Sequence, residues 1–290
     1  MVSSPILMKE ALKNMVQWWS ANRWKALLTL WCLALALVLV LLLSRSCGGD
    51  SDATPKPMSP REVNDLQEVV TDVGMRNQRI AYTGFVVYFN ASMHVPSSVS
   101  YVLTRDRLDG TAQRYGEFEA DPGVRGCAQP SDYSHSGYQR GHMAPAQDMA
   151  WSEESMHASF YMTNVCPQSQ RLNEDAWAKL EEKVREWVQR DSVLVVVTGP
   201  VLEQGLERIE GSGVVIPRRF YKVILAPLAM PMRSIGFVYD NGKCSGGLDD
   251  YAVTVDEVER ITGLNFFMSL PDEVEDQVES RHNLLEWTRH

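Results

Sequence analysis

A run of polar side chains between residues 138 and 185 could carry out acid–base and metal chemistry. The segment YQRGHMAPA at 138–146 contains His142, and histidine is the usual general base at neutral pH. Asn173 follows in the segment LNEDAWAKLEEKVREW at 172–187. An amide oxygen can bind Mg²⁺, which keeps most of its waters and needs few protein ligands. A base that deprotonates water beside such a cation is what hydrolysis of a phosphodiester requires.

Two arginines and an acid accompany this pair. Arg140 lies two residues before His142, and Glu181 and Arg185 lie four apart on one face of an expected helix. Arginine offers a planar fork of donors to phosphate, and Glu181 could orient water bound to a cation. Simpler roles compete with these: Asn173 could cap its helix, and Glu181 and Arg185 could form a surface ion pair.

The elements expected around these residues indicate an α+β domain. Strand-like patterns occur at 84–90, 98–104, 192–197, 220–225 and 234–239. Apolar residues at helical spacing predict a helix over 173–190, and Thr254 and Glu257 form a capping box before a short helix that stops at Gly263. The Gly-, Pro- and Ser-rich residues 121–141 predict a loop. Strands and helices that do not alternate favour a central antiparallel sheet flanked by helices.

The charge of the chain argues mildly against a nucleic-acid partner. The net charge is −9, of which residues 1–50 contribute +3 and the remainder −12. A protein that binds DNA through its overall field is basic. A nuclease with this composition must therefore use a local cluster of arginine and metal.

The N-terminal region predicts a membrane anchor. Residues 26–43 are 18 uncharged, mostly apolar residues behind a basic flank, which predicts a transmembrane helix. Residues 1–25 are then a cytoplasmic basic tail, 44–60 a flexible linker and 61–290 the catalytic domain. The expected localisation is a single-pass membrane protein with the domain outside the cytoplasm: in the periplasm or at the surface of a bacterium, or at the mitochondrial inner membrane of a eukaryote. A lipoprotein signal ending at Cys47 and a cleaved signal peptide stay open.

The segments QRGHMAPA, TNVCPQ and LNEDAWAKLEEKVREW together resemble the DNA/RNA non-specific endonucleases of the ββα-metal fold, the group of Serratia nuclease and endonuclease G. The family pattern is Asp-Arg-Gly-His, then Asn-x-x-Pro-Gln, then Asn-x-x-x-Trp-x-x-x-Glu. The resemblance covers nearly all of 80–275, and it includes VVVTGP at 195–200 and VTVDEVERITGL at 253–264. It implies Mg²⁺-dependent hydrolysis of DNA or RNA with little sequence preference, with Mn²⁺ as a substitute, and it allows a homodimer.

The resemblance also implies a role for each site residue. His142 matches the general base, Asn173 the sole direct protein ligand of the metal, and Glu181 the carboxylate that holds metal-bound water. The remaining matches are an asparagine that supports this geometry and arginines that contact phosphate or steady the site: Asn164, Arg114, Arg140 and Arg185.

One residue departs from the family pattern, because Gln139 stands where the family has Asp. Glutamine keeps a hydrogen bond but not the charge, and activity is still expected. The alternatives to a nuclease are a phosphodiesterase for small phosphodiesters on the same site and an inactive nucleic-acid-binding module. The pairing of Cys47, Cys127, Cys166 and Cys244 stays open.

Overall fold

The computed structural model describes residues 8–18, 20, 58–71 and 77–288. The chain divides into two compact units, residues 1–56 and 57–290. The catalytic residues predicted from the sequence all lie in the second unit. The predicted boundaries of tail, linker and domain stay predictions.

The second unit is built on an antiparallel sheet. In the part of the chain that the structure describes, this sheet has seven strands in the order β10-β9-β8-β7-β4-β3-β2. The strands are β2 (Gln78–Tyr82), β3 (Phe85–Asn90), β4 (Val95–Thr104), β7 (Val193–Pro200), β8 (Arg219–Ala226), β9 (Arg233–Asp240) and β10 (Ala252–Val253). The predicted α+β class with a central antiparallel sheet is confirmed.

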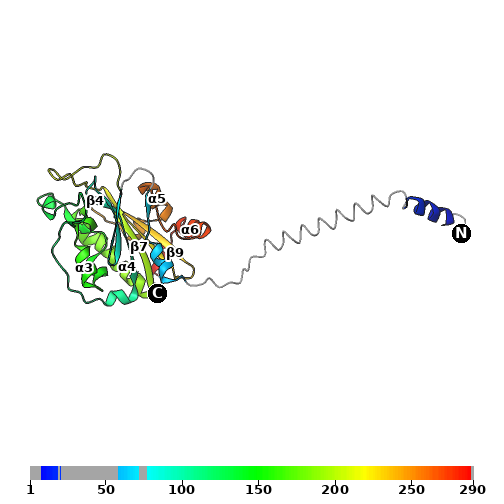
Figure 1. The fold of residues 1–290 in the computed structure, drawn as a ribbon, viewed down its shortest axis with the longest axis horizontal. Coiled ribbons are helices and arrows are strands. Elements are labelled where there is room, and N and C mark those ends of the chain that lie inside the picture. Colours follow the sequence, from blue (N-terminus) through cyan, green and yellow to red (C-terminus); the bar gives the residue numbers. More distant parts are fainter. Residues whose placement is uncertain (1–7, 19, 21–57, 72–76, 289–290) are drawn as a thin grey trace. The chain divides into compact units, whose positions relative to one another are not determined.

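Helices cover both faces of this sheet (Figure 1). Alternate residues of a strand point to opposite faces, and β7 accordingly sends Leu194 and Val196 into one core and Val195 and Val197 into a second. The first core packs beneath α4 (Trp177–Asp191). The second packs beneath α2 (Pro60–Asp65), α5 (Val255–Thr262) and α6 (Asp272–Glu279).

The remaining elements are short. They are β1 (Val70–Thr71) paired with β11 (Leu264–Asn265), β5 (Gln139–His142) paired with β6 (Val165–Gln168), the helices α3 (Glu153–Ser159) and α7 (Leu284–Thr288), and the turns η1 (Arg105–Asp109), η2 (Pro130–Tyr133), η3 (Ala146–Met149), η4 (Met162–Asn164), η5 (Leu172–Ala176) and η6 (Leu248–Asp250).

Local chemistry sets the ends of the helices. The Thr254 hydroxyl accepts a hydrogen bond from the Glu257 amide at 3.1 Å, and α5 ends at Gly263, whose φ of 67° suits a residue without a side chain. Both signals were predicted. The helix predicted over 173–190 begins differently, because η5 is a π-helical turn and regular α-helix starts only at Trp177.

The loop predicted over 121–141 is only partly correct. It contains η2 and the first three residues of β5. Strand β5 exists because it pairs with β6, which lies more than twenty residues further along the chain. A local composition signal does not contain that pairing. Cys127, Cys166 and Cys244 are free thiols, and Cys47 lies outside the described residues.

The predicted transmembrane helix requires correction. Among the residues that the structure describes, no helix is both long and apolar enough to cross a bilayer. This finding contradicts the anchor in the predicted fold class and the predicted single-pass membrane localisation. The segment 26–43, on which both rested, itself lies outside the described residues.

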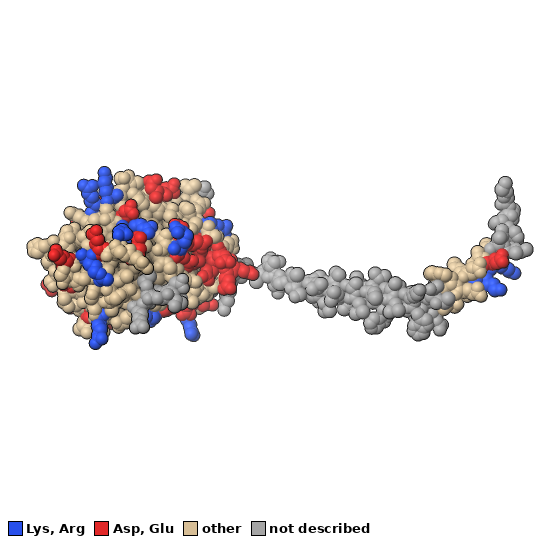
Figure 2. All heavy atoms as spheres, turned by 90° about the horizontal axis from the view of Figure 1, so that it is seen from above, with Lys and Arg blue, Asp and Glu red and all other residues tan. Residues whose placement is uncertain are grey.

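Acidic side chains gather around α6. Figure 2 shows Asp and Glu crowded on the side of the domain where α6 lies in Figure 1. Carboxylate oxygens of Asp256, Glu259 and Glu279 lie within 4.8 Å of one another. Glu279 is 3% exposed, and no described residue pairs with its Oε1. Burial, then the surrounding acids Glu259, Glu275, Asp256 and Asp276, raise the pKa of Glu279 to about 9.

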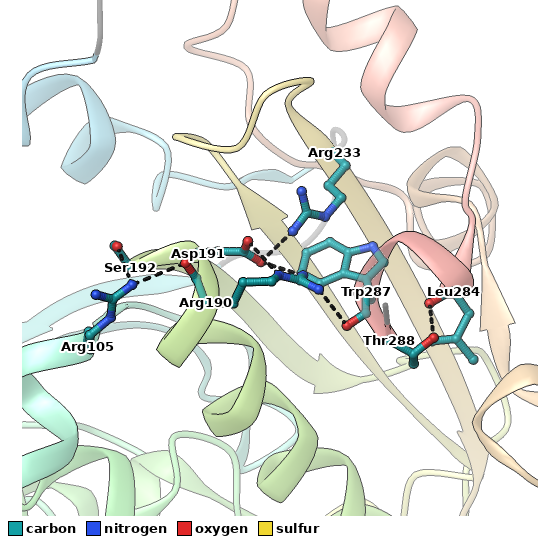
Figure 3. Close-up of polar contacts among 8 residues, drawn as sticks. All are labelled: Arg105, Arg190, Asp191, Ser192, Arg233, Leu284, Trp287 and Thr288. Atoms are coloured by element: carbon teal, nitrogen blue, oxygen red, sulfur yellow. Dashed lines mark hydrogen bonds and ion pairs between the residues drawn. The ribbon is translucent and has the colours of Figure 1, made fainter. Parts of the chain in front are cut away.

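A polar network holds the C-terminal end of α4 (Figure 3). Arg233 of β9 contacts Asp191 at 2.6 Å, and its guanidinium lies 4.9 Å from the ring centroid of Trp287 in α7. Arg190 donates to the backbone oxygen of Trp287 at 3.1 Å, and Arg105 donates to the Ser192 hydroxyl at 2.8 Å. The helix that carries Glu181 and Arg185 is thereby tied to the sheet and to the end of the chain.

The raised pKa of Glu279 implies that the stability of the protein depends on pH. A carboxyl whose pKa is higher in the folded than in the unfolded chain makes folding take up a proton. Its contribution is fully present below its ordinary value of 4.5 and is lost as the pH rises toward about 9. Glu279→Gln, a neutral mimic, should therefore flatten the fall in Tm between pH 5 and pH 9 and raise the Tm at pH 8. The matched control is Glu273→Gln on the same helix, at an exposed position. Equal pH slopes for the wild type and Glu279→Gln would show that Glu279 ionises freely.

Candidate active site

His142 is the last residue of β5. Strand β5 pairs with β6 so that His142 lies opposite Val165 and Gly141 lies opposite Cys166. A Cβ at Gly141 would lie 2.0 Å from Oε1 of the buried Gln168. Only glycine allows this close approach, which explains the small residue directly before the histidine.

Asn164 supports the turn behind His142. It is fully buried, and its side-chain oxygen accepts from the Ala144 amide at 2.8 Å. Its amide nitrogen donates to the carbonyls of Ala144 at 2.9 Å and Ser159 at 2.8 Å. Three of the four hydrogen-bonding positions of the amide are thus used by the backbone. Asn164 therefore steadies the segment after the histidine and does not line the cavity described below.

Asn173 lies in the π-helical turn η5. Its side-chain nitrogen donates to Oε1 of Gln139 at 2.7 Å, and the Gln139 amide nitrogen donates in turn to Glu174. The Asn173 amide is thereby oriented, and no described residue donates a hydrogen bond to its Oδ1. Single π-turns of this kind occur often at functional sites.

Glu181 and Arg185 lie on one face of α4, as predicted, but Arg185 has another partner. It contacts Asp148 of η3 at 3.0 Å, and the Asp148 carboxylate also accepts from the Tyr101 hydroxyl at 3.0 Å. Asp148 is fully buried and Arg185 largely so, with 19% of its side chain exposed. The ion pair of Arg185 is therefore with a residue 37 positions away.

The predicted residues converge on one cavity of about 540 Å³. Six of the seven line it: Arg114, Arg140, His142, Asn173, Glu181 and Arg185. Phe118 also lines the cavity. The Phe118 and Phe160 rings lie 5.0 and 4.9 Å from the His142 ring, measured between centroids. A base, an amide oxygen and guanidinium groups thus face the same space.

The arginines of the cavity are held differently. Arg114 lies over the Phe160 ring at 5.0 Å, and its side chain is exposed. Arg140 donates twice to the carbonyl of Pro130, at 3.1 and 2.6 Å, which fixes it to η2. Arg114 is therefore the freer guanidinium, and Arg140 presents its remaining donors from a fixed position.

The surroundings of His142 favour the neutral imidazole. Nε2 is buried without a hydrogen-bond partner among the described residues. Burial, and then the nearby positive charge of Arg114, lower the pKa of His142 from 6.5 to about 3. A neutral imidazole nitrogen is an acceptor for a proton, which is the state that a general base needs.

Three buried groups of the site are absent from the sequence-based prediction: Tyr101, Asp148 and Lys222. Lys222 of β8 is fully buried, and its Nζ lies 4.6 Å from the ring centroid of Trp177. A signal for it existed in the sequence, because it is the one charge in the run FYKVILA at 220–226. Asp148 carries no comparable signal, since its partner is distant in sequence.

The residues of the cavity fit a single hard cation. Magnesium prefers oxygen ligands and keeps several waters, and the Oδ1 of Asn173 is oriented while its nitrogen is engaged. Among the described residues, the one group of three close acidic or thiol side chains that could hold a metal is Asp256, Glu259 and Glu279. None of these three lines the cavity.

Comparisons with known proteins place the chain in a family. A model of the DNA/RNA non-specific endonuclease family matches residues 62–273. The nuclease C1 of Cunninghamella echinulata is 31% identical over 230 residues, which are 73% of this chain and 90% of that protein. A nuclease of Nostoc is 30% identical over 247 residues, which are 81% of this chain and 84% of that protein.

Mitochondrial proteins are similar as well. The mitochondrial nuclease EXOG of Danio rerio is 33% identical over 214 residues, which are 65% of this chain and 60% of that protein. The match thus spans about 60% of the length of that relative. Among solved structures, a chain of the EndoG/EndoGI complex is superposed with a TM-score of 0.65 at 27% identity, over 74% of this chain and 94% of that one. The family resemblance expected from the motifs is therefore confirmed, and the chain belongs to the DNA/RNA non-specific endonuclease family, a family of nucleases.

Proposed function

We propose that this chain is a metal-dependent endonuclease that hydrolyses phosphodiester bonds of DNA and RNA with little sequence preference. The observation that carries the proposal is the convergence of His142, Asn173 and the arginines on one cavity. Family membership supports the reaction class. Contacts to phosphate carry no sequence information, so a cavity lined by arginines suits cleavage at any base.

His142 is the general base of the proposed mechanism. Its neutral imidazole accepts a proton from a water molecule while the water oxygen attacks phosphorus and the ester P–O bond breaks. The Phe118 and Phe160 rings restrict the orientation of the imidazole. The buried Nε2, which has no described partner, is the atom to which the proton goes.

Asn173 would hold the cation through Oδ1, and Glu181 would orient water beside it. Mg²⁺ is the proposed cation, with Mn²⁺ as a substitute; when bound, it stabilises the charge on the phosphoryl group and the leaving oxygen. Arg114 and Arg140 donate hydrogen bonds to phosphoryl oxygens. Arg185 steadies the site through Asp148.

Two other functions would use the same cavity, namely hydrolysis of small phosphodiesters and binding of nucleic acid without cleavage. A plasmid-nicking assay with Mg²⁺ and with EDTA distinguishes them from the proposal. The proposed enzyme cleaves the plasmid and RNA with Mg²⁺ and stops with EDTA. Cleavage of small phosphodiesters alone, or binding without cleavage, would overturn the endonuclease proposal. A homodimer stays a prediction.

The base and the metal ligand should respond differently to substitution. His142→Ala removes the base and leaves the cation, so kcat should fall by about 10²–10⁴-fold, the usual contribution of general base catalysis. Asn173→Ala removes the direct ligand, so the Mg²⁺ concentration for half-maximal activity should rise together with the loss of rate. Excess Mg²⁺ should restore activity to Asn173→Ala but not to His142→Ala. Near wild-type cleavage by His142→Ala at saturating Mg²⁺ would show that another group is the base.

The protonation state of His142 can be measured directly. The lowered pKa keeps the imidazole neutral as the pH falls through 6.5, the ordinary histidine value, and protonation follows only near pH 3. In NMR titrations the ring resonances of His142, assigned by their loss in His142→Gln, should stay unchanged between pH 8 and pH 5. A titration midpoint near pH 6.5 would contradict the burial of this ring.

Gln139 should act through Asn173. Gln139→Ala removes the acceptor that orients the Asn173 amide, so we expect the Mg²⁺ concentration for half-maximal activity to rise several-fold. Gln139→Asp, the family residue, keeps an acceptor and adds a negative charge near the cation, and its Mg²⁺ requirement should be equal to or below that of the wild type. An unchanged requirement in Gln139→Ala would mean that the hydrogen bond does not orient the ligand.

A further inference from the structure

A buried lysine of β8 has no evident role in the fold. Strand β8 sends Phe220, Lys222 and Ile224 toward the same face as alternate residues, and Phe220 and Ile224 belong to the core beneath α4. Lys222 is 0% exposed, and its Nζ has no hydrogen-bond partner among the described residues. An apolar side chain would fill this position without the cost of burying an ammonium group.

The ammonium of Lys222 lies against the helix that carries the site. Its Nζ is 4.6 Å from the ring centroid of Trp177, and Trp177 lies one helical turn before Glu181. A cation over an indole ring is attracted to it, but the ring does not replace a hydrogen bond. The charges that act on Lys222 are the negative charges of Glu181 and Asp148 and the positive charge of Arg185.

The two buried acids near Lys222, Asp148 and Glu181, differ in their partners. Asp148 forms an ion pair with Arg185 at 3.0 Å and accepts a hydrogen bond from the Tyr101 hydroxyl at 3.0 Å. Glu181 has no comparable ion pair among the described residues. Burial raises the pKa of Glu181, and Lys222 is the strongest charge that opposes this rise. Arg185 thus forms an ion pair with Asp148. Lys222, whose Nζ has no hydrogen-bond partner among the described residues, is the base that acts most strongly on Glu181.

We propose that Lys222 is a positioning residue of the active site, whose buried ammonium is the counter-charge that favours the ionised form of Glu181 at the cavity wall. The proposal rests on the proposed function, in which Glu181 orients water. A buried ion pair is weak evidence for a contribution to stability, because apolar replacements of similar volume are often neutral or stabilising. Lys222 should therefore matter more for activity than for stability.

The test is a double-mutant cycle in the full chain. Lys222→Met keeps the length and packing of the side chain and removes the charge. Its kcat should fall at least tenfold, while its Tm stays equal to or above that of the wild type. Asp148→Asn frees Arg185 from its partner, and Arg185 can then serve Glu181 on the same helix face. The double variant Lys222→Met with Asp148→Asn should therefore be more active than Lys222→Met alone. The matched control, Lys243→Met at an exposed loop position, should keep the wild-type kcat.

A spectroscopic readout makes the inference independent of activity. Infrared spectra at pH 7 contain an absorption of protonated carboxyl groups. The part of this absorption that disappears in Glu181→Gln is due to Glu181. That part should be larger in the Lys222→Met background than in the otherwise unchanged chain, because Glu181 without its counter-charge takes up a proton.

The outcomes separate this inference from the proposed function. If the wild type cleaves nucleic acid with none of the divalent cations tested, the proposed function is overturned. The infrared comparison then still decides whether Lys222 is the counter-charge of Glu181. A wild-type kcat in Lys222→Met, a double variant no better than Lys222→Met, or equal infrared contributions of Glu181 in both backgrounds would overturn the role of Lys222.

Discussion

The packing of one helix against the sheet governs the arrangement of the candidate site. Helix α4 buries Trp177, Leu180 and Val184 beneath it, all 1% exposed or less, and this burial sets the rotation of the helix about its axis. Glu181 and Arg185 must then face the cavity wall, partly out of water. A charge in such a place needs a partner of opposite charge. Asp148 is that partner for Arg185, and Lys222 is the base that acts most strongly on Glu181.

The ribbon of β5 and β6 depends on the same helix. The hydrogen bond between Gln139 and Asn173 joins the start of the ribbon to the turn that leads into α4. At the other end of β5, Asn164 holds the backbone of Ala144, two residues after His142. A small displacement of α4 would therefore move Asn173 relative to His142. The ties of Arg190, Arg233 and Trp287 at the far end of α4 oppose that displacement (Figure 3).

Much of this arrangement could be predicted from the sequence. The central strands are apolar runs because both of their faces are buried, and α4 has an apolar face at helical spacing. Helix α5 has its capping threonine and its terminal Gly263. The motif segments predicted that His142 and Asn173 belong to one site, and both line the same cavity. These features depend on residues close in the chain or on a family pattern that spans it.

Other features depend on contacts that no local pattern contains. The partner of Arg185 lies 37 residues away in η3, and the spacing of Glu181 and Arg185 gives no sign of it. The short strand β5 forms only because β6 is there to pair with it, within a stretch whose composition indicates a loop. The anchor was predicted from apolar composition over 26–43, and the described helices give it no support.

Two acids held out of water show why the environment of a buried charge indicates its use. Glu279 is surrounded by four other carboxyl groups, and burial with their repulsion favours its neutral form. Glu181 is buried beside an acid as well, but Lys222 and Arg185 oppose the loss of its charge. The first arrangement favours a protonated carboxyl at neutral pH, and Glu279 does not line this cavity. In the second, two bases oppose the neutralisation of an acid at the cavity wall, where His142 is held neutral. Environments that push the pKa values of neighbouring groups apart assign acid and base roles in enzymes. For this reason we place the chemistry at the wall of this cavity and not at the cluster of Asp256, Glu259 and Glu279.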